Sequence, residues 1–198
     1  MSPTAAAGTD GRAYLADFSH RRSGPSPLCY VVPSAAGARL FRKRGWRGFH
    51  AAVAPWAAAE GIDLDSLRVV AALPPAGRHA APRPTVPLVT SVAHEGSRVI
   101  VCTLRVPFEL AVFHGHFSTV PIVPGAMLAG WAAALAARHG GWPHGLTYSS
   151  QLKFRRIVQP GPEYRLRLEW TEDGSRVDFR LDTEAAVNAI GSLQAPPP

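Results

Sequence analysis

Residues 113–128 read FHGHFSTVPIVPGAML, a loop rich in histidine, glycine and proline that leads directly into an apolar segment. Pro124 suits the first turn of a helix, and the pair Gly140-Gly141 suits its end. The stretch therefore predicts a helix over residues 124–139 that begins where the loop ends. At about 1.5 Å per residue this helix would span about 24 Å, which is long for a small domain.

Strand-like segments lie on both sides of this helix. Two β-rich runs, at residues 88–94 and 98–106, precede it around a glycine turn. Four more runs follow it, at residues 146–158, 164–172, 176–182 and 186–193. Polar and apolar residues alternate along residues 164–170, and Asp173-Gly174 is typical of a tight hairpin turn. One long helix between antiparallel strands predicts an α+β domain whose sheet wraps around the helix.

The first half of the chain has a different composition. Residues 1–27 are rich in alanine, glycine, serine and proline, and we expect them to be mobile. Residues 28–75 are predicted to form a small strand–helix–strand extension, with the helix over residues 38–60. The proline-rich stretch 76–87 predicts a stiff linker, so the sequence places a domain boundary there and a second domain over residues 88–194.

Charge is uneven along the chain, whose formal net charge is +7. Five cations lie close together in the first half: Arg39, Arg42, Lys43, Arg44 and Arg47. Such a cluster is either a surface for an acidic partner or a solvated helix face. We favour the solvated face, and the absence of an aromatic-interleaved or zinc-finger pattern predicts no nucleic-acid partner.

Several protein classes are disfavoured by composition. Apolar runs stay below the roughly 18 to 20 residues that span a bilayer, and the N-terminal 27 residues lack the pattern of a signal peptide. Cys29 and Cys102 have no metal-ligand spacing and are expected to be buried, reduced thiols. The sequence thus predicts a cytoplasmic protein without a metal, a cofactor or a membrane segment.

Two ordered motifs resemble the hotdog-fold 3-hydroxyacyl-[acyl-carrier-protein] dehydratases. The first combines Phe-x-Gly-His-Phe at residues 113–117 with Pro-x-x-Pro-Gly at residues 121–125, and the second is KFRRIVQPG at residues 153–161. Trp131, in Gly-Trp-Ala, looks most like the branch associated with aryl polyene and related polyene pathways. The resemblance covers about residues 86–194. It implies a hotdog fold, in which an antiparallel sheet wraps around one long central helix.

The resemblance also implies roles for individual residues. His116 would be the base that removes the α-proton of a β-hydroxyacyl thioester, because a neutral imidazole suits that step. The Gly125 amide would stabilise the developing oxyanion, and the Ile122 carbonyl would orient the imidazole. His114 has no such assignment and is expected to be an exposed neighbour.

The resemblance also implies residues that contact the substrate and its carrier protein. The residues expected to contact the acyl substrate are Phe117, Met127, Gly130 and Trp131. The residues that could meet an acidic acyl carrier protein, with its phosphopantetheine-linked chain, are Arg138, Lys153, Arg155 and Arg156. Ordinary core packing, for the apolar residues, and solvated surface charge, for the basic ones, are the alternatives.

One position departs from the family pattern. The family has a Glu or Asp on the central helix fourteen residues after the histidine, and this position is Gly130 here. We expect a heterodimer in which a second hotdog subunit supplies the carboxylate and this chain supplies His116. The alternatives are a homodimer that binds acyl groups without dehydrating them, a non-catalytic structural or acyl-binding partner of a true dehydratase, a weak histidine-only enzyme or isomerase, and a thioesterase-like hotdog protein.

A second, local resemblance concerns the end of the extension. Residues 72–78, ALPPAGR, are similar to a segment in the small C-terminal lid of adenylate-forming ligases, with Arg78 at the position of their catalytic lysine. This likeness would make the extension a remnant that serves as a docking module. A structural extension unrelated to ligases is the alternative.

Overall fold

The computed structural model describes residues 11–21, 28–74, 82–115, 119–141 and 148–194. They form two compact units. Unit 1 comprises the chain up to Arg83 together with Ala111–Pro121, and unit 2 comprises Pro84–Leu110 and the chain from Ile122 onward. The chain first passes from unit 1 to unit 2 after Arg83. This point lies inside the predicted linker at residues 76–87, of which residues 76–81 are outside the described residues.

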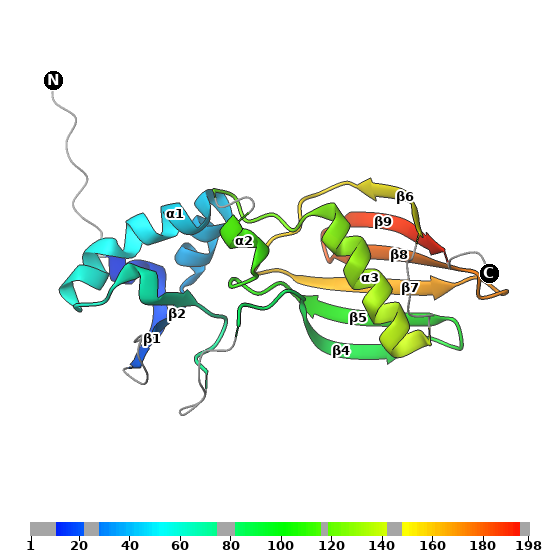
Figure 1. Ribbon diagram of the computed structural model, residues 1–198, viewed down its shortest axis with the longest axis horizontal. Helices are drawn as coiled ribbons and strands as arrows, with labels where there is room; N and C mark the ends of the chain where they lie inside the picture. The colour runs from blue at the N-terminus through cyan, green and yellow to red at the C-terminus, as the bar shows by residue number, and fades with distance from the viewer. Residues whose placement is uncertain (1–10, 22–27, 75–81, 116–118, 142–147, 195–198) are drawn as a thin grey trace, which may run out of the picture. The chain divides into compact units, whose positions relative to one another are not determined.

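Unit 1 is a three-stranded sheet with one long helix (Figure 1). Its elements are η1 (Gly11–Tyr14), β1 (Leu15–Arg21), β2 (Leu28–Pro33), α1 (Ala35–Ala59), η2 (Leu64–Ser66), β3 (Leu67–Val69) and α2 (Val112–Gly115). Strand β2 lies between β1, its antiparallel neighbour, and β3, its parallel neighbour. A parallel pair needs a long crossover, and α1 followed by η2 provides it.

Helix α1 begins at a well-formed cap. The Ser34 hydroxyl accepts a hydrogen bond from the Gly37 amide at 3.2 Å and donates one to the Ala13 carbonyl at 2.9 Å. The buried side of the helix is largely aromatic and contains Phe41, Trp46, Phe49, Val53 and Trp56. The prediction of a helix here is confirmed, although the helix is kinked at Gly45, as glycines inside helices often allow.

Two expectations for this half are corrected. Residues 11–21, which we expected to be mobile, form η1 and strand β1, whose backbone pairs with β2. The last strand of the predicted strand–helix–strand extension is short and covers only Leu67–Val69. Residues 1–10 and Arg78 lie outside the described residues.

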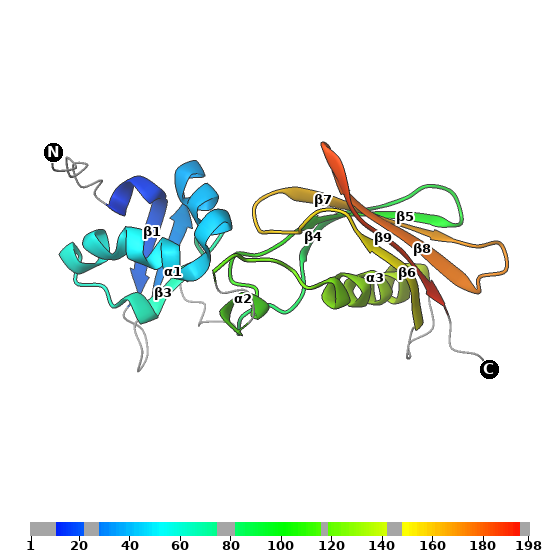
Figure 2. The same cartoon turned by 90° about the horizontal axis from the view of Figure 1, so that it is seen from above.

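Unit 2 is a six-stranded antiparallel sheet with one helix along its face, as Figure 2 shows. Its elements are β4 (Leu88–His94), β5 (Val99–Arg105), α3 (Gly125–Gly140), β6 (Tyr148–Phe154), β7 (Glu163–Trp170), β8 (Arg176–Thr183) and β9 (Ala186–Gln194). The strand order is β4-β5-β7-β8-β9-β6, and α3 packs against β7 and β9. The predicted α+β hotdog architecture is confirmed.

One face of this sheet is buried and the other is exposed, because successive side chains of a strand point to opposite faces. Along β8, Val177, Phe179 and Leu181 are buried, whereas Arg176 and Arg180 are exposed. Buried helix residues supply the other side of the core: Leu128, Ala129, Trp131, Ala132, Leu135 and Ala136. Burying apolar side chains between α3 and the sheet is the main stabilising term, at roughly 25 cal/mol per Å² of apolar surface.

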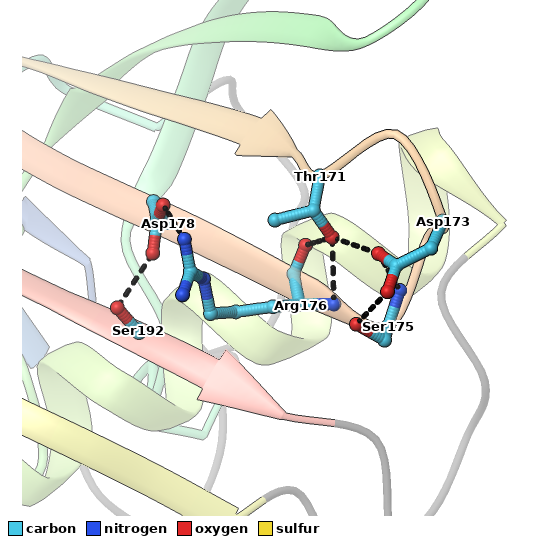
Figure 3. A network of polar contacts seen from close by, with 6 residues as sticks. All are labelled: Thr171, Asp173, Ser175, Arg176, Asp178 and Ser192. Carbon is cyan, nitrogen blue, oxygen red and sulfur yellow. Dashed lines mark hydrogen bonds and ion pairs between the residues drawn. The ribbon is translucent and has the colours of Figure 1, made fainter.

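The polar face carries ion pairs along and between strands. Arg105 pairs with Glu163 at 3.2 Å and Arg180 with Asp182 at 2.8 Å. Figure 3 shows another part of this face, where Asp178 accepts hydrogen bonds from Arg176 and from the Ser192 hydroxyl. Exposed pairs of this kind contribute little stability each, typically about 0 to 1 kcal/mol.

The turn between β7 and β8 has the predicted Asp-Gly form. Gly174 has φ of 68°, which glycine adopts without strain. The Thr171 and Ser175 hydroxyls both donate to Asp173 (Figure 3), and these bonds lower the pKa of Asp173 to about 2. Hydrogen bonds to a carboxylate favour its charged form.

Both cysteines are free and buried, as predicted. Desolvation, helped by the nearby Glu60 charge, raises the pKa of Cys29 to about 11. Within the described ranges, no helix is long and apolar enough to cross a membrane. No group of three or more metal-ligating side chains gathers in this part of the chain either.

Candidate active site

The first turn of α3 presents backbone amides without side-chain caps. Pro124 precedes the helix, and its carbonyl accepts the amides of Met127 at 3.0 Å and Leu128 at 3.3 Å. Among the described residues, the Gly125 amide has no hydrogen-bond partner. Because helix dipoles leave partial positive charge at the N-terminus, this amide suits a developing oxyanion.

An aromatic side chain covers Gly125. A Cβ atom at this position would lie 2.3 Å from the Phe154 ring atom Cζ, and real Cβ contacts are not shorter than about 3 Å. Position 125 therefore admits only glycine unless Phe154 moves. Phe154 ends strand β6 and remains 50% exposed, so its ring borders both the helix terminus and solvent.

A short segment after β6 fixes the start of α3. The Val123 amide donates to the Val158 carbonyl at 2.9 Å, immediately before the helix. The buried Asn188 holds the same segment, because its side-chain amide donates to the Ile157 carbonyl at 3.1 Å and its own carbonyl accepts the Arg155 amide at 2.8 Å. Strand β9 thus positions residues 155–158, which in turn hold the residue before Pro124.

Three basic residues flank Phe154 in sequence. Lys153, Arg155 and Arg156 are exposed, and none forms an ion pair with another described residue. Arg138 is also exposed, but it lies thirteen residues along α3 from Gly125, about 20 Å away. The structure therefore places Arg155 and Arg156 directly after Phe154, whose ring covers Gly125. Lys153 instead lines a hollow on the polar face of the sheet with Arg176 and Asp178, and Arg138 lies toward the other end of α3.

The remaining predicted helix residues have different environments. Trp131 is 7% exposed, and its indole N–H donates to the Thr85 carbonyl at 3.3 Å, so it anchors the segment before β4. Met127 is half-buried. Gly130 is exposed, and a Cβ atom built on it meets no described atom within 4 Å. The described residues therefore leave room for a side chain at position 130.

From Ala126 to Ala134 the exposed side of α3 is small and uncharged, and Arg138 one turn later is its first exposed charge. Ala126, Gly130 and Ala134 follow one another at four-residue spacing on this side, and α3 contains no acidic residue. Solvated helix faces normally carry charged and polar side chains. We call these three residues the small-residue face of α3.

The structure describes only part of the loop at residues 111–121, which we call the histidine loop. His116 and Phe117 lie outside the described residues, while Ile122, whose carbonyl was assigned to orient the imidazole, is half-buried. His114 was expected to be an exposed neighbour, and this expectation is wrong. Its ring lies 4.6 Å from the Trp46 ring, and its Nε2 atom is buried.

Sequence reasoning missed three positions in this region. Phe154 was quoted only as part of a motif, and its contact with Gly125 joins two segments that are far apart in sequence. Asn188 gave no signal, because an asparagine in a weak strand pattern is usually solvated. Trp46 gave one weak signal, since it follows a glycine in an otherwise helical stretch.

Comparisons with known proteins give a family for the region that contains this site. A family model described as ApeI-like, ApeI dehydratase, matches residues 92–192, from inside β4 to inside β9. No curated protein matches the chain in sequence.

Several solved structures are similar. One, titled the dehydratase heterocomplex ApeI:P from Xenorhabdus doucetiae, has 24% identity and a TM-score of 0.49 over 55% of this chain and 96% of its own. An uncharacterized protein from Erwinia carotovora has 24% identity and a TM-score of 0.47 over 57% and 95%. Mouse thioesterase superfamily member 2 has 11% identity and a TM-score of 0.41 over 52% and 77%.

The family model covers about half of the chain and includes all of α3 and nearly the whole six-stranded sheet. It also spans every residue to which the sequence motifs assign a role in the chemistry. The chain therefore belongs to the ApeI-like dehydratase family.

Proposed function

We propose that this chain is the histidine-bearing subunit of a two-chain dehydratase that acts on carrier-protein-bound 3-hydroxyacyl thioesters in polyketide, polyene or fatty-acid-like biosynthesis. The observation that carries the proposal is the contrast between two positions of α3, the one that would stabilise the oxyanion and the one that would carry the acid. The oxyanion position at Gly125 is intact, whereas the acid position is an exposed glycine facing open space.

The reaction requires a base, an acid and an oxyanion donor. In the proposed mechanism His116, as a neutral imidazole, removes the α-proton of the thioester. Negative charge develops on the thioester oxygen, which the Gly125 amide stabilises at the helix terminus. The 3-hydroxyl leaves as water after it takes a proton from the partner's carboxylic acid, and a 2-enoyl thioester remains.

The surroundings of Gly125 support a carrier-bound substrate. Lys153, Arg155 and Arg156 are exposed and lack ion pairs with described residues, so their charge is available to phosphate or to an acidic protein surface. Phe154 offers a half-exposed apolar surface at the helix terminus, where an acyl chain would pass.

The small-residue face of α3 supports a second hotdog subunit. A helix face formed by Ala126, Gly130 and Ala134 lets another backbone approach closely, and it carries no charge before Arg138. A partner helix on this face would place its own side chains beside Gly130. The proposed partner is therefore a hotdog subunit with Glu or Asp on its central helix.

The test compares this chain alone, an acid-bearing hotdog subunit alone, and the two co-expressed, each with a 3-hydroxyacyl carrier-protein substrate. Formation of the 2-enoyl product is followed by mass spectrometry. We expect substantial turnover from the pair and little from this chain. In the pair, His116→Ala is expected to cost about 10²- to 10⁴-fold in rate while assembly persists. Full activity of this chain alone, or of the His116→Ala pair, would contradict the proposal.

A second function is favoured by one observation. Because α3 has no acidic residue, this chain could serve a true dehydratase as a non-catalytic structural or acyl-binding partner. The same experiment separates the two functions. A pair that keeps its activity with His116→Ala, and loses it when this chain is omitted, would establish the structural role.

A further inference from the structure

The loop before α3 belongs to unit 1. In sequence Ala111–Pro121 connects β5 to α3, which are both elements of unit 2. In the structure the same segment forms one compact unit with the N-terminal residues. Its helical turn α2 packs against α1, as Figure 1 shows. His116 follows α2 directly in sequence, so unit 1 includes the loop that carries the proposed base.

Among the described residues, Trp46 makes the aromatic contact between α1 and this loop. Trp46 is 6% exposed, and its ring lies 4.6 Å from the His114 ring at an interplanar angle of 38°. The other side of Trp46 is fixed by α1 itself, through edge contacts with Phe41 at 5.3 Å and His50 at 5.0 Å. Trp46 therefore links the aromatic core of unit 1 to a residue two positions before His116.

The backbone of α1 is built to place this residue. Gly45, immediately before Trp46, has φ of 59° and ψ of −162°, a conformation that is essentially restricted to glycine. It interrupts the helix within a buried stretch, so the residues after it follow a different course from those before it. Such a break costs helix stability, and the contact between Trp46 and His114 is a physical reason for it.

We propose that unit 1 is a positioning module for the histidine loop, and that Trp46 is the positioning residue through which it acts. This inference rests on the proposed function for its catalytic consequence. The contact itself involves described residues only. A docking role alone, or a merely structural extension, would not require α1 to hold the loop that contains the proposed base.

A tryptophan ten residues further along α1 provides the matched control. Trp56 is 3% exposed and makes an edge contact with Phe18 at 5.0 Å, so it is as buried as Trp46 and belongs to the same unit. No ring contact joins it to a described residue of the loop. Replacing either tryptophan by leucine disturbs the core of unit 1, but only Trp46→Leu removes the contact with the loop.

The experiment measures loop protection and turnover in the full chain paired with an acid-bearing hotdog subunit. Amide hydrogen exchange of peptides covering residues 111–121 is recorded at a temperature where every variant is folded. We expect Trp46→Leu to accelerate this exchange about tenfold, whereas Trp56→Leu leaves it near the wild-type rate. We also expect Trp46→Leu to lower kcat about 10- to 100-fold with little change in KM, because small displacements of a reacting group are costly.

Variants on the loop side keep the test valid if Trp46→Leu does not fold. His114→Ala removes the partner ring without altering the core of α1, and it is expected to reproduce both effects. Trp46→Phe and His114→Phe retain an aromatic ring and should preserve most of the protection and the rate. Equal exchange in the Trp46→Leu and Trp56→Leu chains, or full kcat with an exposed loop, would overturn the inference.

The two proposals fail in different ways. Absence of turnover in the wild-type pair would remove the proposed function, whereas the exchange measurements would still decide whether Trp46 holds the loop. Turnover that depends on His116 but not on Trp46 or His114 would remove the positioning role and leave the proposed function in place.

Discussion

Replacing Gly130 by alanine should stabilise the isolated chain. The residue lies inside the sixteen-residue helix α3, is exposed, and has no atom within 4 Å of the position where a Cβ would lie. Alanine in place of glycine inside a helix gains about 0.5 to 1 kcal/mol, mainly because the unfolded chain loses freedom. If the chain unfolds as one cooperative unit, the melting temperature should rise by about 1 to 4 °C.

Urea unfolding followed by far-ultraviolet circular dichroism measures this change as a shift in midpoint at constant slope. Ala134, exposed on the same side one turn later, provides the mirror-image control, and Ala134→Gly should destabilise the chain by about as much, roughly 1 kcal/mol. Gly130→Glu should keep most of the gain because glutamate is a good helix former, while Gly130→Asp should keep less.

The same substitution should have the opposite effect on the proposed pair. A partner helix close to Gly130 would meet the added methyl group, so Gly130→Ala should weaken association while it stabilises the free chain. Association is measured by titrating labelled subunits. A Gly130→Ala chain that is less stable alone would refute the view that position 130 faces open space. Unchanged affinity for the partner would remove Gly130 from the interface.

Three other changes test the region around the helix terminus and the distal turn. Asn188→Ala should destabilise the chain by about 1 to 3 kcal/mol, because the Ile157 carbonyl loses its buried donor, and urea unfolding measures this. Gly125→Ala should displace the Phe154 ring and lower turnover of the pair, checked against the melting temperature to separate activity from folding. The low pKa of Asp173, about 2, means that its contribution to stability is present above about pH 4 and is lost as the pH falls toward 2. The stability difference between the native chain and Asp173→Asn should therefore vanish across that window, and its persistence below pH 2 would contradict this assignment.

Much of unit 2 could be predicted because its signals are local. The alternation along residues 164–170 corresponds to one buried and one exposed face of β7. The Asp173-Gly174 turn needs only a glycine that tolerates positive φ, and the start of α3 needs only Pro124 followed by an apolar helix. Each of these features depends on a few neighbouring residues, so the sequence contains enough information to place them.

The missed features depend on contacts between distant segments. Strand β1 has no clear alternation and exists because Leu15–Arg21 pairs with β2. The contact between Trp46 and His114 joins residues that are far apart in the chain, and no spacing rule connects them. The contact between Phe154 and Gly125 is of the same kind. Tertiary packing decides these features, and a single sequence does not reveal which segments will meet.

The two glycines of α3 in the proposed site have different physical reasons. At Gly125 a side chain would need the space that the Phe154 ring occupies, so a substitution there has to displace this half-exposed ring. Gly130 is required by no contact of the described chain, and its presence costs helix stability of about 1 kcal/mol. No contact among the described residues of unit 2 accounts for that cost. A close-packed partner helix that brings the missing carboxylate would explain both the small side chain and the absent acid, which is why the heterodimer is the form of the proposal that the structure supports best.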